Sequence, residues 1–127
     1  MNDIKFFRCK VCGKIIEELV NAHDTATVCC GEVMQELKPN SLDAALEKHV
    51  PEVTINGDEL KVQVGSTIHP MLDNHYIEWI ILETSEGYSK KDLHPGDKPC
   101  ATFILNENET VVAAYEYCNL HGLWSTK

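Results

Sequence analysis

The chain has 127 residues, of which 43% are hydrophobic, and carries a formal net charge of −9. That length suffices for one ordinary core, or for a small core with a metal-stabilised appendage, and it excludes a large multidomain enzyme. The acidic balance argues against nucleic acid and anionic membranes as partners, and no apolar run approaches the roughly 20 residues of a membrane span.

The N-terminal part of the chain is rich in cysteine, and the remainder carries most of the histidines. Four of six cysteines lie within the first 30 residues, whereas five of six histidines lie beyond residue 40. We therefore expect one domain over 1–37 and another over 38–127, joined by the Pro- and Asn-containing stretch 37–41. A segment of the first size needs a metal to fold, so we expect two or three short strands around a metal ion.

The second domain is predicted to be mostly β. Residues 53–55 and 60–64 alternate apolar and polar, and Asn56-Gly57 between them is typical of a hairpin turn. One helix of about two turns is expected over 41–48, with Ser41 as its N-cap. Short strands between turn signals favour an antiparallel sandwich or barrel. Further strands are expected over 76–82, 101–105 and 110–117.

The first candidate metal group consists of Cys9, Cys12, Cys29 and Cys30. Cys9-Lys10-Val11-Cys12-Gly13 is a C-x-x-C-G knuckle, whose spacing lets two sulfurs face one ion. Cys29 and Cys30 are adjacent, so their side chains diverge unless the backbone bends, and Gly31 would help it bend. Six cysteines in a chain without a signal-peptide pattern indicate a cytoplasmic metal protein, and four thiolates accept either iron or zinc.

The second candidate group comprises five dispersed residues, each a weak signal alone because a lone histidine is more often exposed or satisfied in a core. They lie at expected loop or strand ends, where sites are commonly built. His23 and His94 are interpreted as exposed bystanders, and Cys100 as a buried free thiol. The five candidate ligands are His49, His69, His75, Cys118 and His121.

Both groups together resemble a known family. Cys9-x-x-Cys12 with Cys29-Cys30 resembles the desulforedoxin-type iron centre. Glu47-Lys48-His49, His69-Pro70 to His75, and Cys118-Asn119-x-His121 resemble the superoxide reductase signature. The chain as a whole resembles desulfoferrodoxin, the two-iron class of superoxide reductase. The order of the ligand types matches from Cys9 to His121.

The resemblance implies a desulforedoxin-like Fe(Cys)4 domain and an immunoglobulin-like antiparallel β-sandwich that carries an Fe(His)4(Cys) centre. Four imidazoles would surround the second iron in a plane, with Cys118 as axial thiolate opposite an open position. Lys48 would lie near that position, and Glu47 would be the carboxylate that closes it in the ferric state. Two iron ions are implied, without haem or flavin.

The implied reaction is one-electron reduction of superoxide to hydrogen peroxide, without oxygen production. The resemblance also implies a homodimer and a small electron donor such as rubredoxin. Three alternatives remain open from the residues: an electron-transfer protein using only the four-sulfur site, a zinc-ribbon binding module, and a superoxide dismutase. The reductase alone uses all nine candidate ligands.

Overall fold

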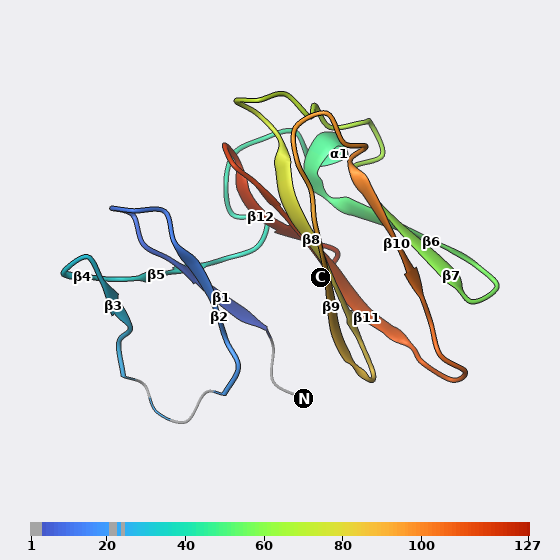
Figure 1. Ribbon diagram of the computed structural model, residues 1–127, viewed down its shortest axis with the longest axis horizontal. Helices are drawn as coiled ribbons and strands as arrows, with labels where there is room; N and C mark the ends of the chain where they lie inside the picture. Colours follow the sequence, from blue (N-terminus) through green and yellow to red (C-terminus); the bar gives the residue numbers. More distant parts are fainter. Residues whose placement is uncertain (1–3, 21–22, 24) are drawn as a thin grey trace. The chain divides into compact units, whose positions relative to one another are not determined.

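The computed structural model describes residues 4–20, 23 and 25–127, and the chain divides into two compact units, Met1–Lys38 and Pro39–Lys127 (Figure 1). Within the described residues, no helix has the length and apolar character needed to cross a membrane.

The first unit is built from five short strands in its described part, more than the two or three expected. A three-stranded antiparallel sheet has the order β2-β1-β5, and β3 pairs with β4 in a separate hairpin. Phe6 and Met34 are its buried large apolar residues. The strands are β1 (Lys5–Arg8), β2 (Ile15–Glu18), β3 (Val28–Cys29), β4 (Glu32–Val33) and β5 (Gln35–Leu37).

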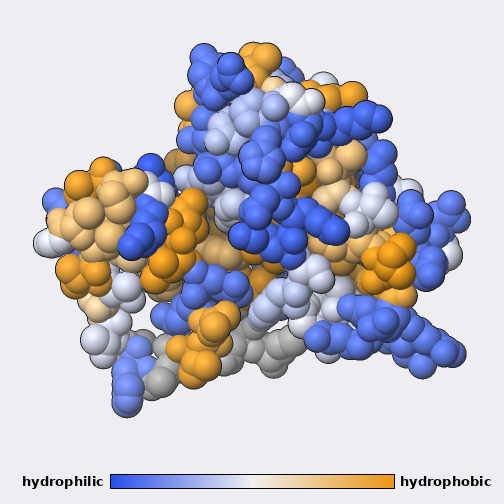
Figure 2. All heavy atoms as spheres, viewed as in Figure 1, coloured by the Kyte–Doolittle hydropathy of each residue, from blue (hydrophilic) through white to orange (hydrophobic). Residues whose placement is uncertain are grey.

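Much of the apolar surface of the first unit stays exposed. Val11, Val28 and Val33 are each about 60% exposed, and Figure 2 shows orange, apolar atoms at the surface over β3 and β4. A unit with so few buried side chains gains little free energy from burial. Its stability therefore depends on the cysteine group described below.

The second unit is the predicted antiparallel β-sandwich. One sheet has the order β10-β7-β6 and the other β12-β11-β8-β9, the three-plus-four arrangement of an immunoglobulin-like domain. The strands are β6 (Pro51–Asn56), β7 (Glu59–Val64), β8 (Ile77–Thr84), β9 (Gly87–Asp92), β10 (Cys100–Ile104), β11 (Val111–Cys118) and β12 (Gly122–Ser125), and one short helix, α1 (Leu46–His49), precedes them.

The core of the sandwich lies between its two sheets. Leu60, Val62 and Val64 alternate along β7 and face Ile80 and Leu82 of β8, all of them buried. This alternation is what the sequence predicted for 60–64. The hairpin expected at Asn56-Gly57 is present, but its two turn residues are Gly57 and Asp58, and Asn56 is the last residue of β6. Packing in the core holds the strands in place. The loops that connect the strands at the end of the sandwich near α1 carry candidate ligands (Figure 1).

The predicted helix over 41–48 is wrong in extent. The helix contains only Leu46–His49, and Ala45, with an extended backbone, precedes it without a side-chain cap. Tertiary bonds hold the preceding segment instead: the Asn40 backbone N–H donates to the Leu123 carbonyl, and the Asn40 side chain bonds Ser125 of β12. These contacts override the helical propensity of the segment.

Candidate metal centres

The four cysteines of the first unit come together as the spacing predicted. All four sulfurs lie within 4.8 Å of one another, and Cys12 Sγ is 3.7 Å from Cys29 Sγ. The first pair sits in a tight turn between β1 and β2, where the Gly13 N–H donates to the Cys9 carbonyl at 2.8 Å. Gly13 has φ +81°, a conformation that glycine adopts at no steric cost.

The bend expected at the adjacent cysteines is present. Cys30 and Gly31 form the two-residue turn between β3 and β4, with φ values of +54° and +74°. Positive φ at both turn positions is the requirement of a type I′ hairpin turn. The turn brings Cys30 Sγ to 4.0 Å from Cys29 Sγ, so two neighbouring residues face the same point.

Without a metal ion, neighbouring cysteine sulfurs shift one another's pKa in opposite directions. A hydrogen bond from the Cys12 backbone lowers the pKa of Cys9 to about 6, whereas its contact with Cys9 raises the pKa of Cys29 to about 12. The Cys9 thiolate therefore forms readily, whereas the Cys29 thiol keeps its proton. A divalent cation would ionise all four, so the donor set fits a thiolate-bound metal ion.

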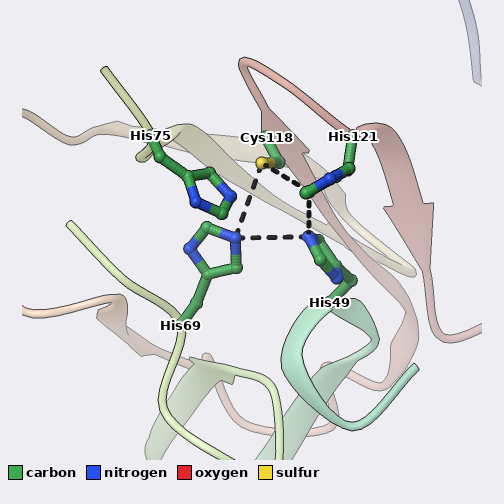
Figure 3. A group of neighbouring side chains, drawn as sticks. All are labelled: His49, His69, His75, Cys118 and His121. Atoms are coloured by element: carbon green, nitrogen blue, oxygen red, sulfur yellow. Dashed lines mark hydrogen bonds between the residues drawn. The ribbon is translucent and has the colours of Figure 1, made fainter. Parts of the chain in front are cut away.

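The second group gathers residues from three distant stretches of the second unit. His49 ends α1, His69 and His75 lie on the β7–β8 connection, and Cys118 and His121 flank the β11–β12 turn (Figure 3). One ligand atom from each lies within 4.8 Å of the others. Figure 3 shows the four rings converging on one point with the sulfur beside them.

Two of the imidazoles are oriented by backbone carbonyls. His49 Nδ1 donates to the Ala45 carbonyl at 2.8 Å, and His69 Nδ1 donates to the Pro70 carbonyl at 2.6 Å. Because a carbonyl only accepts, these bonds place the ring proton on Nδ1 and leave Nε2 with a free lone pair.

The two free lone pairs face each other. His49 Nε2 lies 3.2 Å from His69 Nε2, and burial lowers the pKa of both rings, that of His69 to about 4. His121 Nδ1 also lies 3.0 Å from His49 Nε2, so nitrogens of three rings meet at this point. Neutral imidazole is also the form that binds a metal ion, so the arrangement fits a metal site.

His75 and Cys118 complete this fit. His75 Nε2 is buried without a hydrogen-bond partner among the residues that the structure describes, an arrangement that a bound cation would satisfy. Cys118 Sγ lies 3.5 Å from His69 Nε2 and 3.8 Å from His121 Nδ1. Burial raises the pKa of Cys118, so its thiolate needs an adjacent positive charge.

The other residues considered from the sequence lie as follows. Glu47 and Lys48 are exposed on α1, directly before His49. Burial lowers the pKa of His75, and the nearby charges of His121 and Lys48 lower it further. His23 and His94 are exposed, as expected. Cys100 was expected to be buried, but it is half-buried, because it lies on the face of β10 opposite the core residues Ala101 and Phe103.

Sequence reasoning missed several supporting residues. The carbonyls of Ala45 and Pro70 have no side-chain signal, so only the fold identifies them. Glu116 is fully buried, and both its oxygens lack a partner within the described part of the chain. Burial raises the pKa of this carboxyl, which lies two residues before Cys118 on β11, well above its usual range.

Comparison with known proteins is consistent across the whole chain. Residues 41–127 match the family model described as desulfoferrodoxin, and residues 1–37 match that of the desulfoferrodoxin N-terminal domain. A desulfoferrodoxin from Syntrophotalea carbinolica is 44% identical over 126 residues, covering 98% of this chain and 96% of the relative. One from Nitratidesulfovibrio vulgaris is also 44% identical over 126 residues, covering 99% and 98%.

A solved structure agrees with the sequence matches. The crystal structure of the superoxide reductase from Treponema pallidum has a TM-score of 0.82 and 39% identity, covering 99% of this chain and all of that one. Family models that together span both units, and relatives matched over nearly their full length, show that this chain belongs to the desulfoferrodoxin family.

Proposed function

We propose that this chain is a superoxide reductase: superoxide, one electron and two protons give hydrogen peroxide, and no oxygen is released. The observation that carries the proposal is the convergence of four imidazoles and one thiolate on a single point, in a desulfoferrodoxin whose solved neighbour is a superoxide reductase.

The residues that would hold the two iron ions follow from the two groups. Cys9, Cys12, Cys29 and Cys30 would bind one iron, within a domain over 1–37. His49, His69, His75, Cys118 and His121 would bind the other, within a catalytic domain over 38–127. The second iron, when ferrous, supplies the electron that reduces superoxide.

The ligand set suits an anionic substrate. Four neutral imidazoles and one thiolate leave ferrous iron with one net positive charge, although the whole chain carries −9. The negative chain opposes the approach of superoxide, so local positive charge at the site is important for the association rate. Lys48, exposed beside His49, supplies that charge.

Glu47 and Lys48 are proposed as the catalytic side chains. Lys48 attracts superoxide and orients the water or donates the proton that peroxide formation requires. Glu47 would supply a carboxylate that can bind the second iron in its ferric form. Both project from a one-turn helix that ends in the ligand His49, which is why their position relative to the site is fixed.

The alternative functions explain less of the structure. A carrier that uses only the four-sulfur site, or a zinc-ribbon module, leaves without a reason the convergence of the four imidazoles and Cys118, and the His75 Nε2 that has no partner among the described residues. The proposed electron donor is a small iron–sulfur carrier such as rubredoxin. We further propose a homodimer in the cytoplasm.

Pulsed generation of superoxide tests the function. The iron-loaded, reduced chain should consume superoxide in a fast second-order reaction and form one peroxide for each superoxide, with no oxygen. Oxygen release without any reductant would assign a dismutase, and slow consumption without a change at the second iron would assign an electron carrier.

A further inference from the structure

Gly65 makes an unusually close approach to the backbone of α1. A Cβ placed on Gly65 would lie 2.2 Å from the Glu47 carbonyl oxygen and 2.7 Å from Lys48 Cα, closer than real Cβ atoms come to other atoms. Gly65 also has φ +66°. Among the seven glycines of the chain, this is the one whose missing side chain leaves room for another segment's backbone.

The Glu47 carbonyl needs a hydrogen-bond donor that its own helix cannot provide. An α-helical bond at the end of α1 runs from the Val50 N–H to the Leu46 carbonyl at 3.0 Å. The corresponding donor for Glu47 would be residue 51, which is Pro51 and has no N–H. The helix therefore ends with an acceptor that only another segment can satisfy.

The turn after β7 provides that donor. The Thr67 N–H donates to the Glu47 carbonyl at 2.8 Å, and the Ser66 hydroxyl lies 3.4 Å from the same oxygen. The close packing of Gly65 is what allows Thr67 to come within hydrogen-bond distance. The bond thus attaches α1, with Glu47 and Lys48, to the segment that leads to His69.

The turn itself is held firmly by the sandwich. The Gln63 side-chain amide donates to the Gly65 carbonyl at 3.0 Å, and the His69 N–H lies 3.3 Å from the Val64 carbonyl. Gly65 is buried, and Val64 just before it belongs to the core. A turn fixed in this way can locate a one-turn helix that has few internal bonds of its own.

We infer that Gly65 is a positioning residue: its close contact with the Glu47–Lys48 backbone, together with the Thr67 hydrogen bond, sets where the Lys48 ammonium group and the Glu47 carboxylate stand at the mouth of the site. The inference rests on the proposed superoxide reduction and deepens it. The atoms that a Cβ on Gly65 would meet first belong to Glu47 and Lys48, so Gly65 acts through α1.

Gly65→Ala tests this role, with Gly57→Ala as matched control. Gly57 has φ +67°, almost the value of Gly65, but a Cβ there would meet nothing within 4 Å. The positive φ is therefore matched in the two variants, and only Gly65→Ala also introduces a clash with another backbone. In the iron-loaded full chain, Gly65→Ala should slow the second-order reaction with superoxide about tenfold and weaken its salt dependence. Gly57→Ala should change neither.

The double variant Gly65→Ala/Lys48→Ile distinguishes an effect on the position of Lys48 from a general loss of structure. If Gly65 acts through Lys48, Gly65→Ala should cause no further slowing in the Lys48→Ile background. An equal slowing in both backgrounds, or an unchanged rate and salt dependence in Gly65→Ala alone, would overturn the inference.

Hydrogen exchange measured by mass spectrometry gives a readout that needs no superoxide. In the iron-loaded parent chain the Thr67 amide should be protected, and Gly65→Ala should release it. An unprotected Thr67 amide in the parent would overturn the inference even if Gly65→Ala failed to fold. A parent that shows this protection but does not react with superoxide would instead contradict the proposed function alone.

Discussion

The indole ring of Trp124 stacks on the imidazole of His49, with centroids 5.0 Å apart and planes 28° from parallel. The same indole donates its Nε1–H to the His121 carbonyl at 2.9 Å. Trp124 is buried, so one rigid side chain supports two of the candidate ligands from behind.

Trp124→Ala should therefore loosen the second metal site and destabilise the sandwich. Removal of a buried tryptophan costs about 3–5 kcal/mol in free energy of unfolding, and loss of support behind ligands lowers metal affinity about 10–100-fold. Iron retention against a chelator and chemical denaturation measure the two effects. Trp124→Phe keeps an aromatic ring on His49 and should lose less of both; equal losses in the two variants would show that stacking contributes nothing.

Lys48→Ile should slow the reaction with superoxide about tenfold, because a cation that attracts the anion to the site is removed. The parent rate should fall as ionic strength rises, and the variant rate should depend less on salt, since screening acts on the attraction that Lys48 provides. Pulse radiolysis at several salt concentrations measures both. Lys90→Ile removes the same charge from the exposed strand β9, where Lys90 pairs with Asp92 at 3.2 Å. If both variants behaved alike, the effect would be one of net charge.

Cys12→Ser should remove the iron of the first unit and unfold that unit, because metal ligation supplies the folding free energy that its small core lacks. Reaction of the reduced second iron with superoxide should persist. Cys100→Ser, at a half-buried cysteine outside both groups, should leave both irons in place. Loss of superoxide reduction in Cys12→Ser with the second iron still bound would instead assign an electron-relay role to the first iron.

Because the Tyr115 hydroxyl is buried, we expect the free energy of unfolding to fall in alkaline solution. Its hydroxyl donates to Glu83 Oε1 at 3.1 Å, and burial raises the pKa of Tyr115 from 10.0 to about 12. As the pH rises from about 10 to about 12, the unfolded chain loses this proton and the folded chain keeps it, so the free energy of unfolding falls in that window.

Tyr115→Phe should remove this alkaline component, and at neutral pH it should cost about 1 kcal/mol for the lost hydrogen bond. Denaturation of parent and variant from pH 8 to 12 checks both effects. The same alkaline slope in parent and variant would assign it to other groups.

The sequence predicted turns that contain a characteristic glycine motif and strands in which apolar and polar residues alternate. The C-x-x-C-G knuckle, the Cys-Cys-Gly bend and the Asn56-Gly57 hairpin each have a local cause, because a glycine in each provides a positive φ that the turn requires. The alternating β7 strand was found because one of its faces packs in the core. The five dispersed ligands were weak candidates from their positions at expected loop or strand ends, and the resemblance joined them into one site, since no local pattern links them.

Some strands were not predicted, and the extent of the short helix was wrong, because their residues show no alternating or periodic pattern. All residues of β9 are exposed and all of β12 are buried, so neither strand alternates. The short α1 and the contact of Gly65 with Glu47 depend on residues far apart in the chain, which periodicity does not report. Local signals therefore define the strands and turns, and tertiary packing defines how the ligands meet.

Mössbauer spectroscopy of the ⁵⁷Fe-loaded chain tests most directly whether the His49, His69, His75, Cys118 and His121 group binds iron. We predict two iron environments in equal amounts, one of which disappears in His75→Asn while the tetrathiolate signal stays; His94→Asn, at an exposed histidine, should keep both. A single tetrathiolate environment in the parent chain, unchanged by His75→Asn, would contradict the account.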